Sequence, residues 1–249
     1  MTPHCRYVLR LADTNLVLAQ RLGAWVGHAP ALEEDLGIAN VSLDLLGQAR
    51  LLLTHAGELE ARGRGEDALA YLREESEYLN LTLVEQPNGD FGDTIVRQFL
   101  FDAWQLELYG KLALSKDERL AAIAAKGARE ATYHLRYSGG WLMRLGDGTA
   151  ESHGRVAESL ARLWPFTNEL FDGDEVDRAV SAAGIGPDPE SLRDGWLRHV
   201  EEVLAGATLT QPAAATFGWY GKQGRHSEHL GYLLAEMQSL HRAHPGAAW

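Results

Sequence analysis

The chain has 249 residues, of which 45% are hydrophobic and 23% charged, the composition of an ordinary soluble globular protein. Its net charge of −12 at pH 7 argues against nucleic acid or an anionic membrane as the main partner. The one cysteine, Cys5, excludes an internal disulfide. The N-terminus lacks the apolar core of a signal peptide, and no run of 18 apolar residues occurs. We therefore expect a cytoplasmic protein without a membrane-spanning helix.

Four long helices are predicted in the first 146 residues, because apolar residues recur there at helical spacing and strand patterns are scarce. The first spans about 5–26, the second begins within HAPALEEDL and runs to about 60, and the other two span about 91–114 and 117–145. Short connections join the first two helices and the last two, and one longer connection separates the pairs. This layout predicts an all-α fold, a ferritin-like four-helix bundle made of two hairpins with one crossover.

Shorter helices are predicted after the bundle, at about 151–171, 173–183, 189–204 and 225–242. We interpret the chain as a single domain, with a core bundle at about 5–146 and a helical C-terminal extension at about 150–249. The connection 206–224 is long and rich in Gly, Ala and Pro, and loops of that length more often serve function or an interface.

Each of the four long helices carries an acidic residue among apolar neighbours: Asp13, Asp44, Asp102 and Glu130. His134 follows Glu130 by four residues, so both lie on one helix face. An acid on a buried stripe needs a partner or a metal. Any single acid is more simply explained as solvated, capping or paired, whereas the set indicates a buried polar cluster.

The chain lacks the ligand motif of a carboxylate-bridged di-iron site. Such a site uses Glu-x-x-His on two of its four helices. No histidine of this sequence follows a Glu or Asp by three residues. His226 and His229 have a spacing that could bind zinc, but no cysteine or third histidine lies close in sequence, so we favour a helix start or an interface there. The sequence predicts a bundle without a competent iron site.

Several segments together resemble the C-subunit family of the bacterial phenylacetyl-CoA epoxidases, the ring-epoxidising multicomponent monooxygenases of phenylacetate degradation. The segments cover most of the chain: IANVSLDLLGQAR, LVEQPNGDFGDTIVRQF, AREATYHLRYS, LWPFTNELFD, HSEHLG with LAEMQ, and the closing HPGAAW. In register with the di-iron motif, Ala131 stands where a glutamate would precede His134. Gly47 stands where a histidine would follow Asp44.

The resemblance implies a ferritin-like subunit of a complex that adds one oxygen atom of O₂ across the aromatic ring of phenylacetyl-CoA. It implies that a paralogous catalytic subunit holds the di-iron centre. A reductase with FAD and an iron–sulfur cluster would supply electrons from NADPH. This chain would carry a degenerate site without a cofactor, and it would pair with the catalytic subunit as a hetero-oligomer. Asp13, Asp44, Asp102, Glu130 and His134 would then form a vestigial, structural cluster, with Glu130 and His134 hydrogen-bonded to each other.

Three functional hypotheses follow. The first is a non-catalytic scaffolding subunit of the epoxidase, inactive alone. The second is a di-iron or single-metal oxidase in its own right, which the four acids favour and the missing motif opposes. The third is a module that binds CoA thioesters, for which the sequence offers no Lys/Arg cluster suited to the phosphates.

Overall fold

The structure is a computed structural model that describes residues 1–213 and 218–247. Over these residues the regular elements are helices, with one isolated β-bridge between Tyr220 and Arg225. The chain divides into two compact units, Met1–Pro87 with Tyr220–Trp249, and Asn88–Trp219. The all-α prediction is confirmed.

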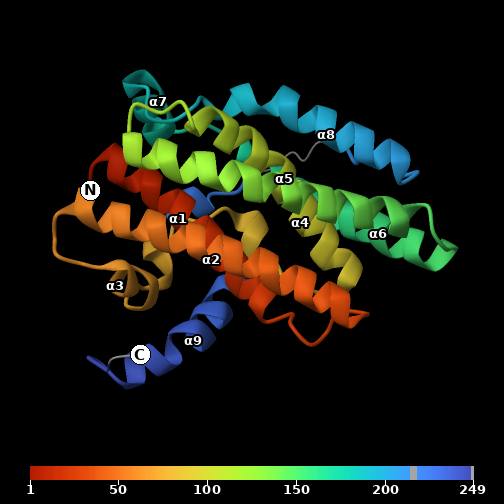
Figure 1. Ribbon diagram of the computed structural model, residues 1–249, viewed down its shortest axis with the longest axis horizontal. Helices are drawn as coiled ribbons and strands as arrows, with labels where there is room; N and C mark the ends of the chain where they lie inside the picture. The colour runs from red at the N-terminus through yellow and green to blue at the C-terminus, as the bar shows by residue number, and fades with distance from the viewer. Residues whose placement is uncertain (214–217, 248–249) are drawn as a thin grey trace. The chain divides into compact units, whose positions relative to one another are not determined.

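The first unit is built on a hairpin of two long helices, α1 (Pro3–Gly23) and α2 (Leu32–Glu60), which run side by side in Figure 1. α1 begins at a Thr2 cap and is buried on nearly every side. The helix α3 (Glu66–Tyr71) and the 3₁₀ turns η1 (Glu75–Glu77) and η2 (Thr82–Glu85) follow. After the 3₁₀ turn η5 (Gly221–Gln223), α9 (Glu228–Ala243) returns from the far end of the sequence to contact α1, α3, η1 and η2.

The second unit is built on the hairpin of α4 (Phe91–Leu112) and α5 (Glu118–Gly146). α6 (Ala150–Leu163) and α8 (Arg193–Gly206) pack on both helices. The 3₁₀ helices η3 (Trp164–Leu170) and η4 (Pro189–Leu192) and the helix α7 (Glu175–Ala183) complete the unit. The Trp196 indole donates to the Leu100 carbonyl over 3.0 Å and so attaches α8 to α4.

The helices lie close to their predicted ranges. α1 ends three residues early, because the chain turns at Ala24–Gly27, and the predicted helix 151–171 divides into α6 and η3 at Pro165. The predicted loop 206–224 includes α8's last residue and η5, and its residues 214–217 lie outside the described part, as do residues 248–249 of the closing motif.

α2 is long and apolar enough to cross a membrane by length and composition, with a mean hydropathy of 1.2 over its most apolar 18 residues. Of that window, 44% is buried within the protein, which a core helix also shows. The prediction of a chain without a spanning helix therefore stays a prediction. Composition alone does not assign α2 to a membrane.

Candidate functional site: two buried polar clusters

The first cluster surrounds Asp13 on α1, whose carboxylate is fully buried in the first unit. Arg73 forms an ion pair with it through both terminal nitrogens, Nη1 at 2.9 Å from Oδ2 and Nη2 against Oδ1. The Leu79 amide also donates to Oδ2 over 2.9 Å. Both carboxylate oxygens therefore have donors, and the negative charge has a cation beside it.

Arg73 is itself held from several sides. Its Nε donates to the Leu69 carbonyl over 2.5 Å and its Nη1 to the Glu77 carbonyl over 2.9 Å. The guanidinium carbon lies 4.3 Å from the centre of the Tyr78 ring, a cation–π contact. Burial alone would lower the pKa of Arg73, but the charge and hydrogen bonds of Asp13 outweigh it and the pKa is raised. The guanidinium therefore stays charged.

Tyr78 connects this cluster to α9. Its hydroxyl donates to the Ala70 carbonyl and accepts from Gln238 Nε2 at 2.9 Å. Gln238 also donates to the Arg73 carbonyl over 3.1 Å. Burial raises the pKa of Tyr78, so the phenol keeps its proton.

A second buried acid of this unit, Glu85, holds the segment that enters α9. Its Oε2 lies 3.0 Å from His226 Nδ1, and its Oε1 accepts from the Ser227 amide at 2.6 Å. The other ring nitrogen, His226 Nε2, lies 2.8 Å from the Tyr78 carbonyl oxygen. The Tyr78 carbonyl oxygen can only accept, so Nε2 carries a proton and donates to it, while Nδ1 contacts the Glu85 carboxyl group. His226 is a structural residue just before α9, as the interpretation as a helix start expected.

The second cluster lies between α4 and α5 in the second unit, around the fully buried Asp102. Gln98 Nε2 donates to Oδ1 at 2.6 Å, and Ser138 Oγ donates to Oδ2 at 2.7 Å. His134 is fully buried as well, and its charge acts on Asp102. Burial raises the pKa of Asp102 to about 7, although His134 and the bonds from Ser138 and Gln98 lower it. The carboxyl group therefore exchanges a proton near neutral pH.

The remaining predicted residues are less enclosed. Asp44 is half-buried on α2. Glu130 keeps 18% of its side chain exposed and forms an ion pair with Lys126 at 3.4 Å, one turn earlier on α5. Ala131, where the motif would need a glutamate, is fully buried. The hydrogen bond between Glu130 and His134 stays a prediction.

The surroundings of Asp13 do not suit a divalent metal. Each oxygen of Asp13 and of Asp102 accepts a hydrogen bond from the protein, and Asp13 has a buried cation beside it. A divalent metal at Asp13 would be repelled by Arg73. Asp102 and His134 are the predicted site residues that the second unit brings together.

The sequence identified the buried acids but not the residues that form hydrogen bonds and ion pairs with them. Arg73, Tyr78 and Gln238 come from segments that carry no helical pattern of their own or lie far along the chain. Ser138 could have been found, because it follows His134 by four residues and so lies on the same face of α5.

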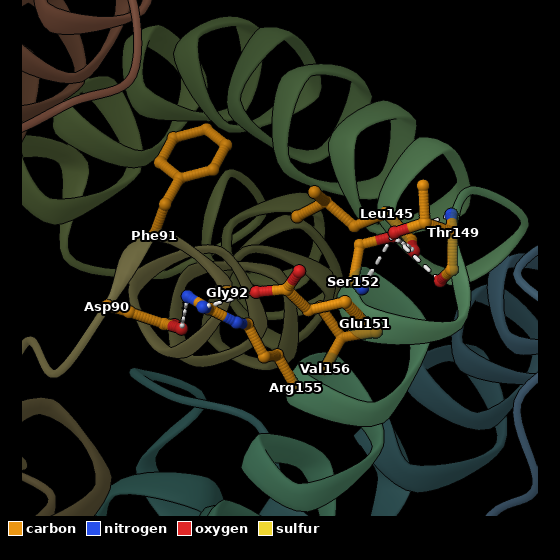
Figure 2. A pocket seen from close by; sticks show the side chains of 9 residues that line it. All are labelled: Asp90, Phe91, Gly92, Leu145, Thr149, Glu151, Ser152, Arg155 and Val156. Atoms are coloured by element: carbon orange, nitrogen blue, oxygen red, sulfur yellow. Dashed lines mark hydrogen bonds and ion pairs between the residues drawn. The ribbon is translucent and has the colours of Figure 1, made fainter.

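The second unit also has a surface pocket of about 260 Å³ where α4 begins, α5 ends and α6 begins (Figure 2). Phe91, Leu145 and Val156 form its apolar wall. Its charged groups are paired with one another: Arg155 lies 3.2 Å from Asp90 and 2.6 Å from Glu151, and Figure 2 shows these side chains beside one another. The described residues that line this pocket therefore offer no uncompensated charge to a ligand.

Comparison with known proteins agrees with the resemblance. Residues 1–249 match the family described as phenylacetic acid catabolic protein. The chain is 53% identical over 243 residues to the C subunit of the 1,2-phenylacetyl-CoA epoxidase of Escherichia coli (strain K12), covering 98% of each protein. The predicted similarity to that family of subunits is confirmed, and the chain belongs to the phenylacetic acid catabolic protein family.

Proposed function

We propose that this chain is the non-catalytic, scaffolding subunit of a phenylacetyl-CoA epoxidase in aerobic phenylacetate catabolism. The match to the Escherichia coli epoxidase subunit over nearly the whole length of both proteins supports the assignment to that complex. The observation that carries the non-catalytic role is the Asp13–Arg73 pair, because a carboxylate neutralised by a buried guanidinium is withdrawn from metal binding.

The catalytic partner is then a paralogous subunit with a di-iron centre, and a reductase with FAD and an iron–sulfur cluster delivers electrons from NADPH. The chain itself has no cofactor, epoxidises nothing alone, and works in the cytoplasm. We also propose a ferritin-like bundle, in which the two hairpins α1–α2 and α4–α5 join with a single crossover. The order and length of these four helices support it.

The chain's own contribution is to pack against the catalytic subunit and hold it in an active shape. Its polar clusters fix neighbouring segments without iron: Asp13 and Arg73 connect α1 to the segment after α3, and Asp102 with Ser138 connects α4 to α5. A paralogue that keeps its core rigid in this way presents a fixed surface to its partner.

Reconstitution tests the function. The catalytic subunit, the reductase and any further subunits of the complex are assayed for epoxidation with and without this chain. We expect activity to need the chain and to remain with the double variant Asp102→Asn/His134→Gln, provided that it folds. If that variant binds the catalytic subunit normally but abolishes epoxidation, the chain takes part in the chemistry and the second hypothesis, an oxidase in its own right, gains support.

A further inference from the structure

α2 is apolar on two faces. The face toward its own unit carries Ile38, Val41, Leu45 and Leu52, all at most 2% exposed. The opposite face carries the leucine stripe, which we define as Leu32, Leu36, Leu43 and Leu51. These side chains are 70%, 58%, 63% and 40% exposed. No described residue of the chain covers them well.

The leucine stripe is continuous along the helix. The spacings of four, seven and eight residues keep its members on one side of an α-helix. The stripe runs for about 29 Å, from the rise of 1.5 Å per residue. Asn40 and Gly47 lie between the leucines, and a Cβ at Gly47 would meet nothing within 4 Å, so no residue that the structure describes fills the space there.

Charged residues lie mostly near the two ends of the leucine stripe. Glu33, Glu34 and Asp35 form the first turn of α2, whereas Asp44 is the one charged residue between Leu36 and Ala49. Arg50, at the other end, is already paired with Glu66 at 2.8 Å. An occupant of this face must therefore be apolar along its length and basic beside the first turn of α2.

We propose that the leucine stripe is the centre of the interface with the catalytic subunit, and that it receives a helix of that subunit with an apolar stripe and Lys or Arg residues opposite Glu33, Glu34 and Asp35. This inference rests on the proposed function. Permanent subunit interfaces are apolar at their centre and polar at their rim, which is the pattern of α2. A stable interface takes about 20–30 residues from each side, so the leucine stripe forms the core of a larger contact.

A bilayer fits the face less well than a protein helix does. The chain carries a net charge of −12, and the three acids of the first turn would be repelled by anionic headgroups. The same acids assist a basic partner by steering its approach.

The test measures the affinity of the full chain for the purified catalytic subunit. We expect Leu36→Glu and Leu43→Glu each to raise Kd by about 10-fold or more, because each puts an unpaired carboxylate into a buried apolar contact. Leu114→Glu and Leu240→Glu are matched controls, since these leucines are 85% and 55% exposed and lie outside α2. They should change Kd by less than about 3-fold. All four variants should keep the melting temperature of the parent, because none of these side chains is buried in the chain alone.

A charge variant tests the predicted partner chemistry separately. Glu33→Lys/Glu34→Lys should slow association and weaken its dependence on salt, with a smaller effect on dissociation. An unchanged association rate would contradict the basic occupant.

Three results would overturn the inference. If the parent chain binds the catalytic subunit and the two stripe variants bind equally well, the docking surface is wrong while the proposed function stands. If the parent does not bind the catalytic subunit at all, the proposed function fails and this occupant with it. If instead the variants abolish self-association in sedimentation equilibrium, or binding to phosphatidylcholine vesicles, while the heteromeric complex persists, the occupant is a second copy or a membrane.

Discussion

Asp13 and Arg73 form an ion pair in which the two side chains are 0% and 1% exposed. The two residues are 60 positions apart, and the pair joins the middle of α1 to the irregular segment that follows α3. A charge pair enclosed this completely cannot be lost from one side without leaving the other charge uncompensated. Loss of either side chain alone would therefore destabilise the first unit.

Removing the cation is the strongest test of this pair. We expect Arg73→Gln to lower the free energy of unfolding by about 3–5 kcal/mol, because it leaves Asp13 buried without its counterion. Urea denaturation at pH 7 measures the change. The matched control is Arg50→Gln, which breaks a pair with Glu66 whose Arg side chain is 66% exposed, and its effect on stability should be much smaller.

The double variant Asp13→Asn/Arg73→Gln removes both charges of the pair. It should recover part of the loss, because no charge remains without its counterion. Equal losses for Arg73→Gln and Arg50→Gln would show that the buried pair has no special role.

Asp102 makes stability depend on pH in a direction opposite to that of an ordinary carboxylate. Its pKa is raised to about 7 from 3.8, so between these pH values the folded chain keeps a proton that the unfolded chain has released. Stability from this group is therefore present below about pH 4 and falls as pH rises to about 7, by at most about 4 kcal/mol. Asp102→Asn has no such titration. Relative to the parent, this variant should gain stability between pH 5 and pH 8 in urea denaturation, and a constant difference across that range would contradict the assigned pKa.

Burial raises the pKa of Asp102, and Ser138 is one of the residues that lower it. Ser138→Ala removes a donor to the buried carboxylate and should cost about 1–3 kcal/mol. Because that hydrogen bond lowers the pKa of Asp102, the variant should also move the titration to higher pH, a shift that simple loss of packing would not produce. Thr132→Ala is the control on the same helix, since Thr132 is exposed and its hydroxyl donates to the Ala128 carbonyl of its own helix. ¹³C NMR of the Asp carboxyl carbons measures the titration, and an unchanged midpoint would refute the role given to Ser138.

His226 is predicted to donate a hydrogen bond from Nε2 to the Tyr78 carbonyl oxygen, which lies 2.8 Å away and can only accept. Its Nδ1 lies 3.0 Å from the Glu85 carboxyl group. ¹⁵N NMR of the imidazole should find a proton on Nε2, and Glu85→Gln should shift the Nδ1 signal, because it replaces the group that contacts this nitrogen. An unprotonated Nε2 in the parent chain would contradict this assignment. The exposed His244 provides the reference signal.

The helices could be predicted from the sequence because their apolar periodicity is strong. The boundaries of α2, α4 and α5 came within about two residues, and the caps at Asp90 and Asp117 explain where two of them begin. The return of α9 to the first hairpin could not be predicted. That contact depends on Gln238 meeting Arg73 and Tyr78, more than 150 positions away, and no local pattern encodes such a meeting.

The candidate site could likewise be predicted only in part from the sequence. Asp13, Asp102 and His134 were identified because an acid or imidazole on an apolar helix face needs compensation. Their partners were out of reach, because Arg73 lies in a run of acidic residues without periodicity and looks solvated in the sequence. The exposed side of α2 was also missed, since a helix with two apolar faces gives no sign of which face remains uncovered.

Metal analysis of the isolated chain, expressed in iron-rich medium and purified without chelator, separates a scaffold from an oxidase in a single measurement. We expect well under one iron per chain, together with a stoichiometric complex when the catalytic subunit is added. Two irons per chain, lost on substitution of Asp102 and His134, would contradict the scaffolding role and establish the chain as a metal-binding oxidase.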